Sequence, residues 1–145
     1  MVKLASPADI QTSIRRIARR ISAPPALLPE TVPSAWGAPH IEVDRLYHFV
    51  VCERGLELER RSSPALDDLF YWIFQSVTFS MASDCELALR KPHEDSRRQL
   101  FTRQLDLMNT LNPTWSNRLR DELAEIVAAY PFSDDQGRAE RFEKS

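Results

Sequence analysis

The strongest hydrophobic pattern of the chain covers residues 63–82 and predicts a helix. Leu69 and Ile73 lie one helical turn apart, and aromatic side chains fill many of the remaining positions. Ser63 suits the N-cap and Pro64 the first helical position, where a missing N–H costs nothing. Acidic and hydroxyl side chains within the stretch argue against a membrane span. We therefore expect a central helix that other elements cover on two sides.

Alternating apolar and polar positions predict three short strands before this helix. The strands are expected at residues 40–44, 46–52 and 56–61. A short loop separates the last two, and Gly55 within it is able to adopt a positive φ, which is typical of a hairpin. In the last strand Glu57 and Glu59 alternate with Leu56 and Leu58. We expect the carboxylates on a solvated face and the leucines on a dry face that packs against the central helix.

Residues 1–39 are predicted to form a helix and a proline-rich connector. Ser6 and Pro7 open the helix, whose isoleucines form the apolar stripe. Its opposite face carries four arginines: Arg15, Arg16, Arg19 and Arg20. Prolines throughout residues 23–39 indicate an extended connector laid over the surface. The expected anchors of this connector are Leu27, Leu28 and Trp36.

The C-terminal part of the chain is predicted to be helical. A new cap at residues 83–84 begins a short helical piece, and a long helix follows at residues 94–111 with its arginines outward. Asn112 and Pro113 cap and open a further helix. The apolar stripe of that helix is Trp115, Leu119, Leu123, Ile126, Val127 and Tyr130. Residues 133–145 are charged and are expected to be frayed.

Together these elements predict an α+β fold. The fold is a three-stranded antiparallel sheet packed on a central apolar helix, with about three further helices. The 145 residues suit a single domain spanning residues 1–145 with one hydrophobic core. Within that domain we distinguish the N-terminal helix and connector (1–39), a core region (40–132) and the frayed tail (133–145).

Charge and cysteine content narrow the classes of function. A net charge of -2 argues against a protein that mainly coats nucleic acid or anionic membrane. Basic residues nevertheless predominate at the N-terminus and acidic residues after residue 120. Cys52 and Cys85 lack a metal-ligand spacing, and no secretory signal begins the chain. We expect a cytoplasmic protein with reduced thiols.

The sequence holds no pattern that requires catalysis, a metal or a cofactor. His40, His48 and His93 are far apart in the sequence. The paired carboxylates are explained by a solvated strand face and by the favourable field at a helix start. The few glycines leave no phosphate-binding loop, and no serine lies in a nucleophile elbow. We therefore expect no catalytic, cofactor-binding or metal-binding residues.

Several stretches of the chain resemble the immunity protein 63 family of bacterial polymorphic toxin systems. The similarity is carried by residues 47–55, 57–61, 69–74, 77–82, 97–101 and 111–115, so it extends over residues 40–132. The resemblance implies a protein that is encoded beside a toxin and protects the producing cell by binding the toxin domain. It also implies that the protein is not an enzyme, and it transfers no specific contact residues.

The hairpin is the preferred contact for such a partner, because its charges are not needed by the core. If the toxin has a basic active site, its contacts are expected among the acidic hairpin residues. The candidate toxin-binding residues are Glu53, Arg54, Glu57 and Glu59, followed by Asp121, Glu122 and Glu125 on the last helix.

Two other functions stay open. Aromatic residues of the central helix around Trp72 are able to line a ligand or active-site pocket, which predicts a small ligand-binding domain or enzyme. The arginine-rich first helix is able to bind phosphates, which predicts a nucleic-acid-binding regulator. The identity of the toxin and the oligomeric state, including a homo-oligomer, are not set by the sequence.

Overall fold

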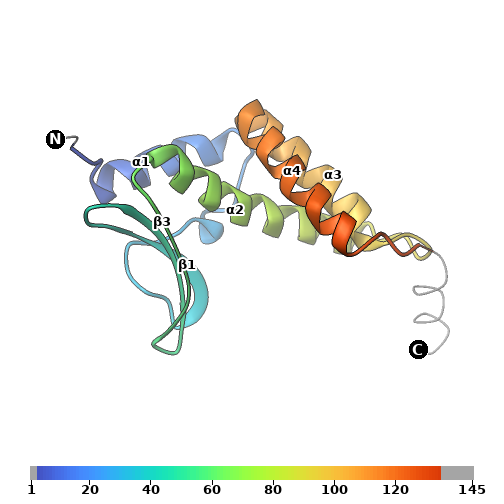
Figure 1. Ribbon diagram of the computed structural model, residues 1–145, viewed down its shortest axis with the longest axis horizontal. Coiled ribbons are helices and arrows are strands. Elements are labelled where there is room, and N and C mark those ends of the chain that lie inside the picture. The colour runs from blue at the N-terminus through green and yellow to red at the C-terminus, as the bar shows by residue number, and fades with distance from the viewer. Residues whose placement is uncertain (1–2, 135–145) are drawn as a thin grey trace. The chain divides into compact units, whose positions relative to one another are not determined.

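The computed structural model describes residues 3–134 and confirms the α+β fold (Figure 1). Its elements, in chain order, are α1 (Pro7–Arg19), the short 3-10 helix η1 (Pro25–Leu27), β1 (Trp36–Val43), β2 (Tyr47–Glu53), β3 (Leu56–Ser63), α2 (Leu66–Ala88), α3 (Ser96–Leu111) and α4 (Pro113–Ala129). The chain divides into two compact units, Met1–Val77 and Thr78–Ser145, and α2 runs through the boundary between them.

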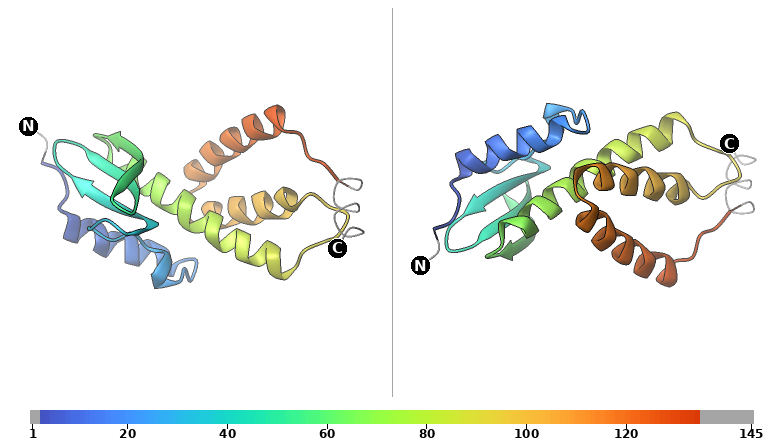
Figure 2. Two further views of the ribbon diagram at one scale, coloured as in Figure 1. Left: turned by 90° about the horizontal axis from the view of Figure 1, so that it is seen from below. Right: turned by 90° about the horizontal axis from the view of Figure 1, so that it is seen from above.

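Helix α1 begins where the sequence predicted. The Ser6 hydroxyl accepts a hydrogen bond from the backbone N–H of Asp9 at 3.2 Å, and Pro7 occupies the first helical position. Ile10 and Ile14 are each only 1% exposed, so the predicted isoleucine stripe faces the core. Figure 2 shows α1 alongside the sheet in two opposite views.

The sheet is an antiparallel meander in the order β1-β2-β3, as predicted. The β2–β3 loop is the two-residue turn Arg54-Gly55, with φ values of 52° and 80°. Positive φ at both positions is the requirement of a type I′ turn, whose twist matches that of the flanking strands. Arg54 is held there although it is not glycine, and its backbone N–H also donates to the Ala35 carbonyl at 3.3 Å.

The prediction that Leu56 and Leu58 form a dry, buried face of β3 is wrong. Leu56 is 65% exposed and Leu58 is 55% exposed. The pairing shifts between Val51, opposite Glu59, and Cys52, opposite Glu57, so Leu58 is an extra residue in β3. Such a bulge interrupts the alternation of faces on which the prediction rested.

The connector between η1 and β1 lies along the edge of the sheet. The prediction that Trp36 anchors it is wrong, because this residue is exposed. The backbone N–H of Ile41 donates to the Glu30 carbonyl at 2.9 Å, which ties the connector to β1. Leu27 and Leu28 are half-buried. Trp36, by contrast, is 89% exposed. It opens β1, which begins before the predicted residue 40, and the strand carries its side chain outward.

The core of the first unit lies between the helices and the sheet. In Figure 1, α1 and the first half of α2 lie on the same side of the sheet. Apolar side chains from all of these elements are buried: Ile10, Ile14, Ala18, Ile21, Ile41, Tyr47, Phe49, Val50, Leu69, Tyr71, Ile73, Phe74 and Val77. The burial of these α2 side chains agrees with the central apolar helix that the sequence predicts.

Helix α2 is longer and begins later than predicted. Ser63 belongs to β3, and its hydroxyl accepts from the Ala65 N–H at 3.0 Å and donates to Asp68 at 2.7 Å. The helix therefore starts at Leu66. The new cap expected at residues 83–84 is wrong, because neither proline nor glycine interrupts the chain there and the helix continues to Ala88.

In the second unit, α3 and α4 form a helical hairpin (Figure 2). The Asn112 side chain accepts from the Thr114 N–H at 2.9 Å with Pro113 in the first turn, as predicted. The buried apolar residues are Ala82, Met108, Leu111, Trp115, Leu119 and Leu123. The predicted stripe of α4 fails at its end, because Ile126 is 43% exposed and Tyr130 is 72% exposed.

Residues 130–134 are bound to the start of α3. The Arg97 guanidinium donates to the carbonyls of Tyr130 at 2.8 Å and Pro131 at 2.9 Å. Asp95 caps α3 and also accepts from the Ser133 N–H at 2.9 Å. Two arginines predicted to point outward therefore hold the chain after α4, since Arg98 pairs with Asp134. The remainder of the frayed tail predicted at residues 133–145 lies outside the described residues.

The carboxylate of Asp44 organises the turn between β1 and β2. It accepts hydrogen bonds from the Leu46 N–H at 2.9 Å and from His48 Nε2 at 2.7 Å. These contacts, the Leu46 bond foremost, lower the pKa of Asp44 from 3.8 to about 2. His48 is buried, and its Nδ1 lies 2.6 Å from the Ser62 hydroxyl, so it links the turn to β3.

Replacing Asp95 with alanine is expected to lower the free energy of unfolding by about 2 kcal/mol, because a helix cap and charge-assisted hydrogen bonds are lost together. Urea unfolding of the purified variant measures this change. Asp106→Ala, at an exposed position of the same helix, is the control and should change stability little. Equal losses in the two variants would contradict the role assigned to Asp95.

Replacing Asp44 with asparagine is expected to flatten the loss of stability in acid. A carboxyl whose folded pKa is lowered stabilises the fold above its unfolded pKa, and this contribution disappears as the pH falls from 3.8 to about 2. Thermal unfolding at a series of pH values, compared between wild type and variant, measures the difference. An equally steep decline in Asp44→Asn would count against the turn contacts.

Candidate protein-binding surface

The outer strand β3 carries a series of ion pairs. Arg60 Nη2 lies 2.7 Å from Glu57 Oε1 and 3.3 Å from Glu42 Oε1, so one guanidinium joins β3 to β1 across the sheet. Arg61 Nε lies 2.6 Å from Glu59 Oε1 on the same strand. The carboxylates predicted as toxin contacts at positions 57 and 59 are therefore already paired with arginine.

A buried histidine extends this series into the sheet. His40 Nε2 lies 2.7 Å from Glu42 Oε2, and His40 is fully buried. The hydrogen bond from His40, with a further contribution from Arg60, holds the pKa of Glu42 below its usual value. The hydrogen bond with Glu57 likewise raises the pKa of Arg60. Glu42 and Arg60 are therefore both charged at neutral pH, and the strand presents a surface of mixed charge in which acidic and basic side chains pair with one another.

The tip of the hairpin is different from the strand behind it. Glu53 and Arg54 are both exposed. Among residues 3–134 neither side chain has an ion-pair partner. Two of the predicted contact residues are therefore available to charges on another molecule.

Apolar side chains that the sequence reasoning missed lie beside these two charges. Trp36 is the register partner of Glu53, and Glu53 is the register partner of Leu56, so the three side chains stand next to one another. Leu58 follows on the same strand. We call Trp36, Glu53, Arg54, Leu56 and Leu58 the hairpin-tip patch. The signal in the sequence was the Trp36-Gly37 pair at the end of a proline-rich connector, where a large apolar residue directly precedes a glycine.

The second predicted set of contacts lies on α4, in the other compact unit. Asp121 and Glu125 are exposed. Glu122 is half-buried and lies 3.6 Å from Arg118. This side of the helix is acidic, as its sequence indicated.

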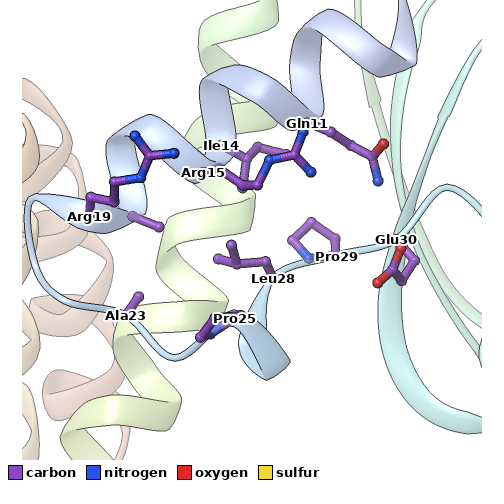
Figure 3. Close-up of a pocket in the computed structure, with 10 residues that line it drawn as sticks. Gln11, Ile14, Arg15, Arg19, Ala23, Pro25, Leu28, Pro29 and Glu30 are labelled. Atoms are coloured by element: carbon purple, nitrogen blue, oxygen red, sulfur yellow. The ribbon is translucent and has the colours of Figure 1, made fainter.

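A groove of about 300 Å³ lies between α1 and the connector (Figure 3). Its floor is apolar, and Arg15 and Arg19 line it from α1 while Glu30 lines it from the connector. The two arginines lie four residues apart, where like charges repel. Within the described chain neither forms an ion pair. The groove therefore offers positive charge to an anion.

Metal binding, the two cysteines and the surroundings of Trp72 are further candidates for a site within the described residues 3–134. Between residues 3 and 134 no group of three or more His, Cys, Asp or Glu side chains is placed to hold a metal ion. Cys52 and Cys85 are free, and Cys85 borders a shallow groove between α2 and α3. Trp72 is half-buried and lines neither that groove nor the one beside α1.

The length and hydrophobicity of the described helices show whether any of them could cross a membrane. None of them combines the length and the apolar character needed to cross a bilayer. This holds for α2 as well, whose first turn contains Asp67 and Asp68.

Comparison with known proteins places the chain in a family. The family model described as Immunity protein 63 matches residues 44–125, which is more than half of the chain. The match includes β2, β3, α2, α3 and most of α4. No curated relative and no solved structure matches the chain. The chain belongs to the immunity protein 63 family.

Proposed function

We propose that this protein neutralises a cognate bacterial toxin by binding and occluding the toxin domain. Membership of an immunity protein family is the observation that carries the proposal, because it implies a toxin as partner. The protein would act in the cytoplasm of the producing cell, as part of a polymorphic toxin system used in bacterial competition. Occlusion needs no catalytic step or cofactor, so we propose that the protein is not an enzyme.

The exposed hairpin supports a role in binding a protein. Its charges lie on a surface that the core does not need, and charged groups speed encounter with a partner of opposite charge. Speed matters for this function, since the toxin must be captured before it damages the cell. The acidic residues Asp121, Glu122 and Glu125 of α4 are a second candidate contact surface.

The groove beside α1 favours one alternative function. Arg15, Arg16 and Arg19 are exposed cations without an ion-pair partner in the described chain, and such clusters bind phosphates. A regulator that binds nucleic acid through α1 would bind DNA with a steep dependence on salt. The other alternative, a ligand or active-site pocket near Trp72, has no specific observation in its favour.

Coexpression tests the proposed function directly. The open reading frame next to this gene is expressed in a bacterial host with and without this protein. We expect the neighbouring protein alone to stop growth, and this protein to restore growth and to copurify with it. A toxic neighbour that this protein neither relieves nor binds would contradict the proposal.

Charge reversal tests the hairpin as the contact surface. The double variant Glu57→Lys and Glu59→Lys is expected to bind a basic toxin at least tenfold more slowly at low salt, because it replaces two ion pairs with a cluster of positive charges that repels a basic partner. Asp121→Lys with Glu125→Lys on α4 is the matched comparison. Stopped-flow association measures both. An unchanged rate and affinity in the hairpin variant would remove β3 from the interface.

A further inference from the structure

Trp36 is presented to solvent by an ordered backbone. Its N–H donates to the Ser34 hydroxyl at 3.0 Å, and the carbonyl before it, on Ala35, accepts from the Arg54 N–H at 3.3 Å. Gly37 follows with a φ of 81°, a conformation that glycine adopts without strain. The connector is thereby bonded to the hairpin turn, and Trp36, which is 89% exposed, projects from a hydrogen-bonded backbone.

Trp36 is not the only exposed large apolar residue at this end of the sheet. Leu56 stands on the far side of Glu53 in the register and is 65% exposed, and Leu58 is 55% exposed. Single exposed apolar residues are common, but a group of large ones at one place is typical of a binding surface. Tryptophan and arginine are also the residues most often found at the energetic centre of protein interfaces.

The open edge and the bulge of β3 bear on how a partner binds this patch. As the last strand of the sheet, β3 has an edge that no described strand covers. The bulge at Leu58 and the row of charged side chains are features that hinder pairing of an edge with another strand. The partner therefore contacts the side chains of the patch and does not extend the sheet.

Charge decides which kind of partner fits. Glu57 and Glu59 are neutralised by Arg60 and Arg61, so the strand beside the patch has no excess of positive charge to attract a phosphate backbone or an anionic membrane. The unpaired Glu53 and Arg54 are instead able to pair with one basic and one acidic group on a partner. A folded protein with an apolar recess flanked by both charges fits this arrangement.

We infer that the hairpin-tip patch is the energetic centre of the toxin interface, with Trp36 inserted into an apolar recess of the toxin domain. This inference rests on the proposed function and names the surface that performs it. Trp36 lies outside residues 44–125, the part that matches the family.

Alanine substitution tests the inference in the full-length protein. Trp36→Ala is expected to weaken binding of the toxin encoded by the neighbouring gene about thirtyfold or more, mainly through faster dissociation. Leu56→Ala should weaken it by a smaller factor. Leu87→Ala is the matched control, because Leu87 is 61% exposed but lies on α2 outside the patch. Surface plasmon resonance gives the rate constants.

Circular dichroism of the free proteins separates binding from folding, since an exposed side chain contributes little to the core. Phosphatidylglycerol vesicles serve as a second probe, and we expect no binding to them. If wild-type protein binds the toxin and Trp36→Ala binds equally well, the inference is overturned while the proposed function stands. If wild-type protein does not bind the toxin, the proposed function fails as well. Vesicle binding that depends on Trp36, without an effect on the toxin, would also overturn the inference.

Discussion

The burial of helix α2 is the constraint on which the rest of the structure depends. Leu69, Tyr71 and Phe74 are fully buried, and the helix has apolar side chains on nearly every side. A helix of this kind is stable in water only when other elements cover it. In the first unit, α1 and the sheet contribute to the same core, and in the second unit α3 and α4 form a packed hairpin. The apolar side chains left outside these cores are therefore informative.

The sequence predicted those parts of the fold that depend on local rules. The Ser6 and Asn112 caps, the isoleucine stripe and the hairpin turn at Gly55 all follow from neighbouring residues, and the structure confirms them. The bulge at Leu58 could not be predicted, because it depends on the pairing between β2 and β3 and leaves no mark in β3 alone. The hydrogen bonds from Arg97 to the carbonyls of residues 130–131 could not be predicted either, because they join segments that are far apart in the sequence.

The candidate contact surface was predicted only in part, for the same reason. Exposed charge at Glu53 and Arg54 follows from the turn, and both side chains are indeed exposed. The pairing of Glu57 with Arg60 depends on side-chain geometry, and the exposure of Trp36 depends on a hydrogen bond between the connector and the hairpin. In this account charge sets how fast the partner is met, and the apolar patch sets how long it stays bound.

The most direct test of the central claim is hydrogen–deuterium exchange of this protein, free and bound to the toxin encoded by the neighbouring gene. Exchange reports the protection of each backbone segment separately and needs no substitution. The account predicts slower exchange on binding in peptides covering residues 34–37 and 53–58, with little change in α4. Protection confined to α4, with the hairpin exchanging as fast in the complex as in the free protein, would contradict it.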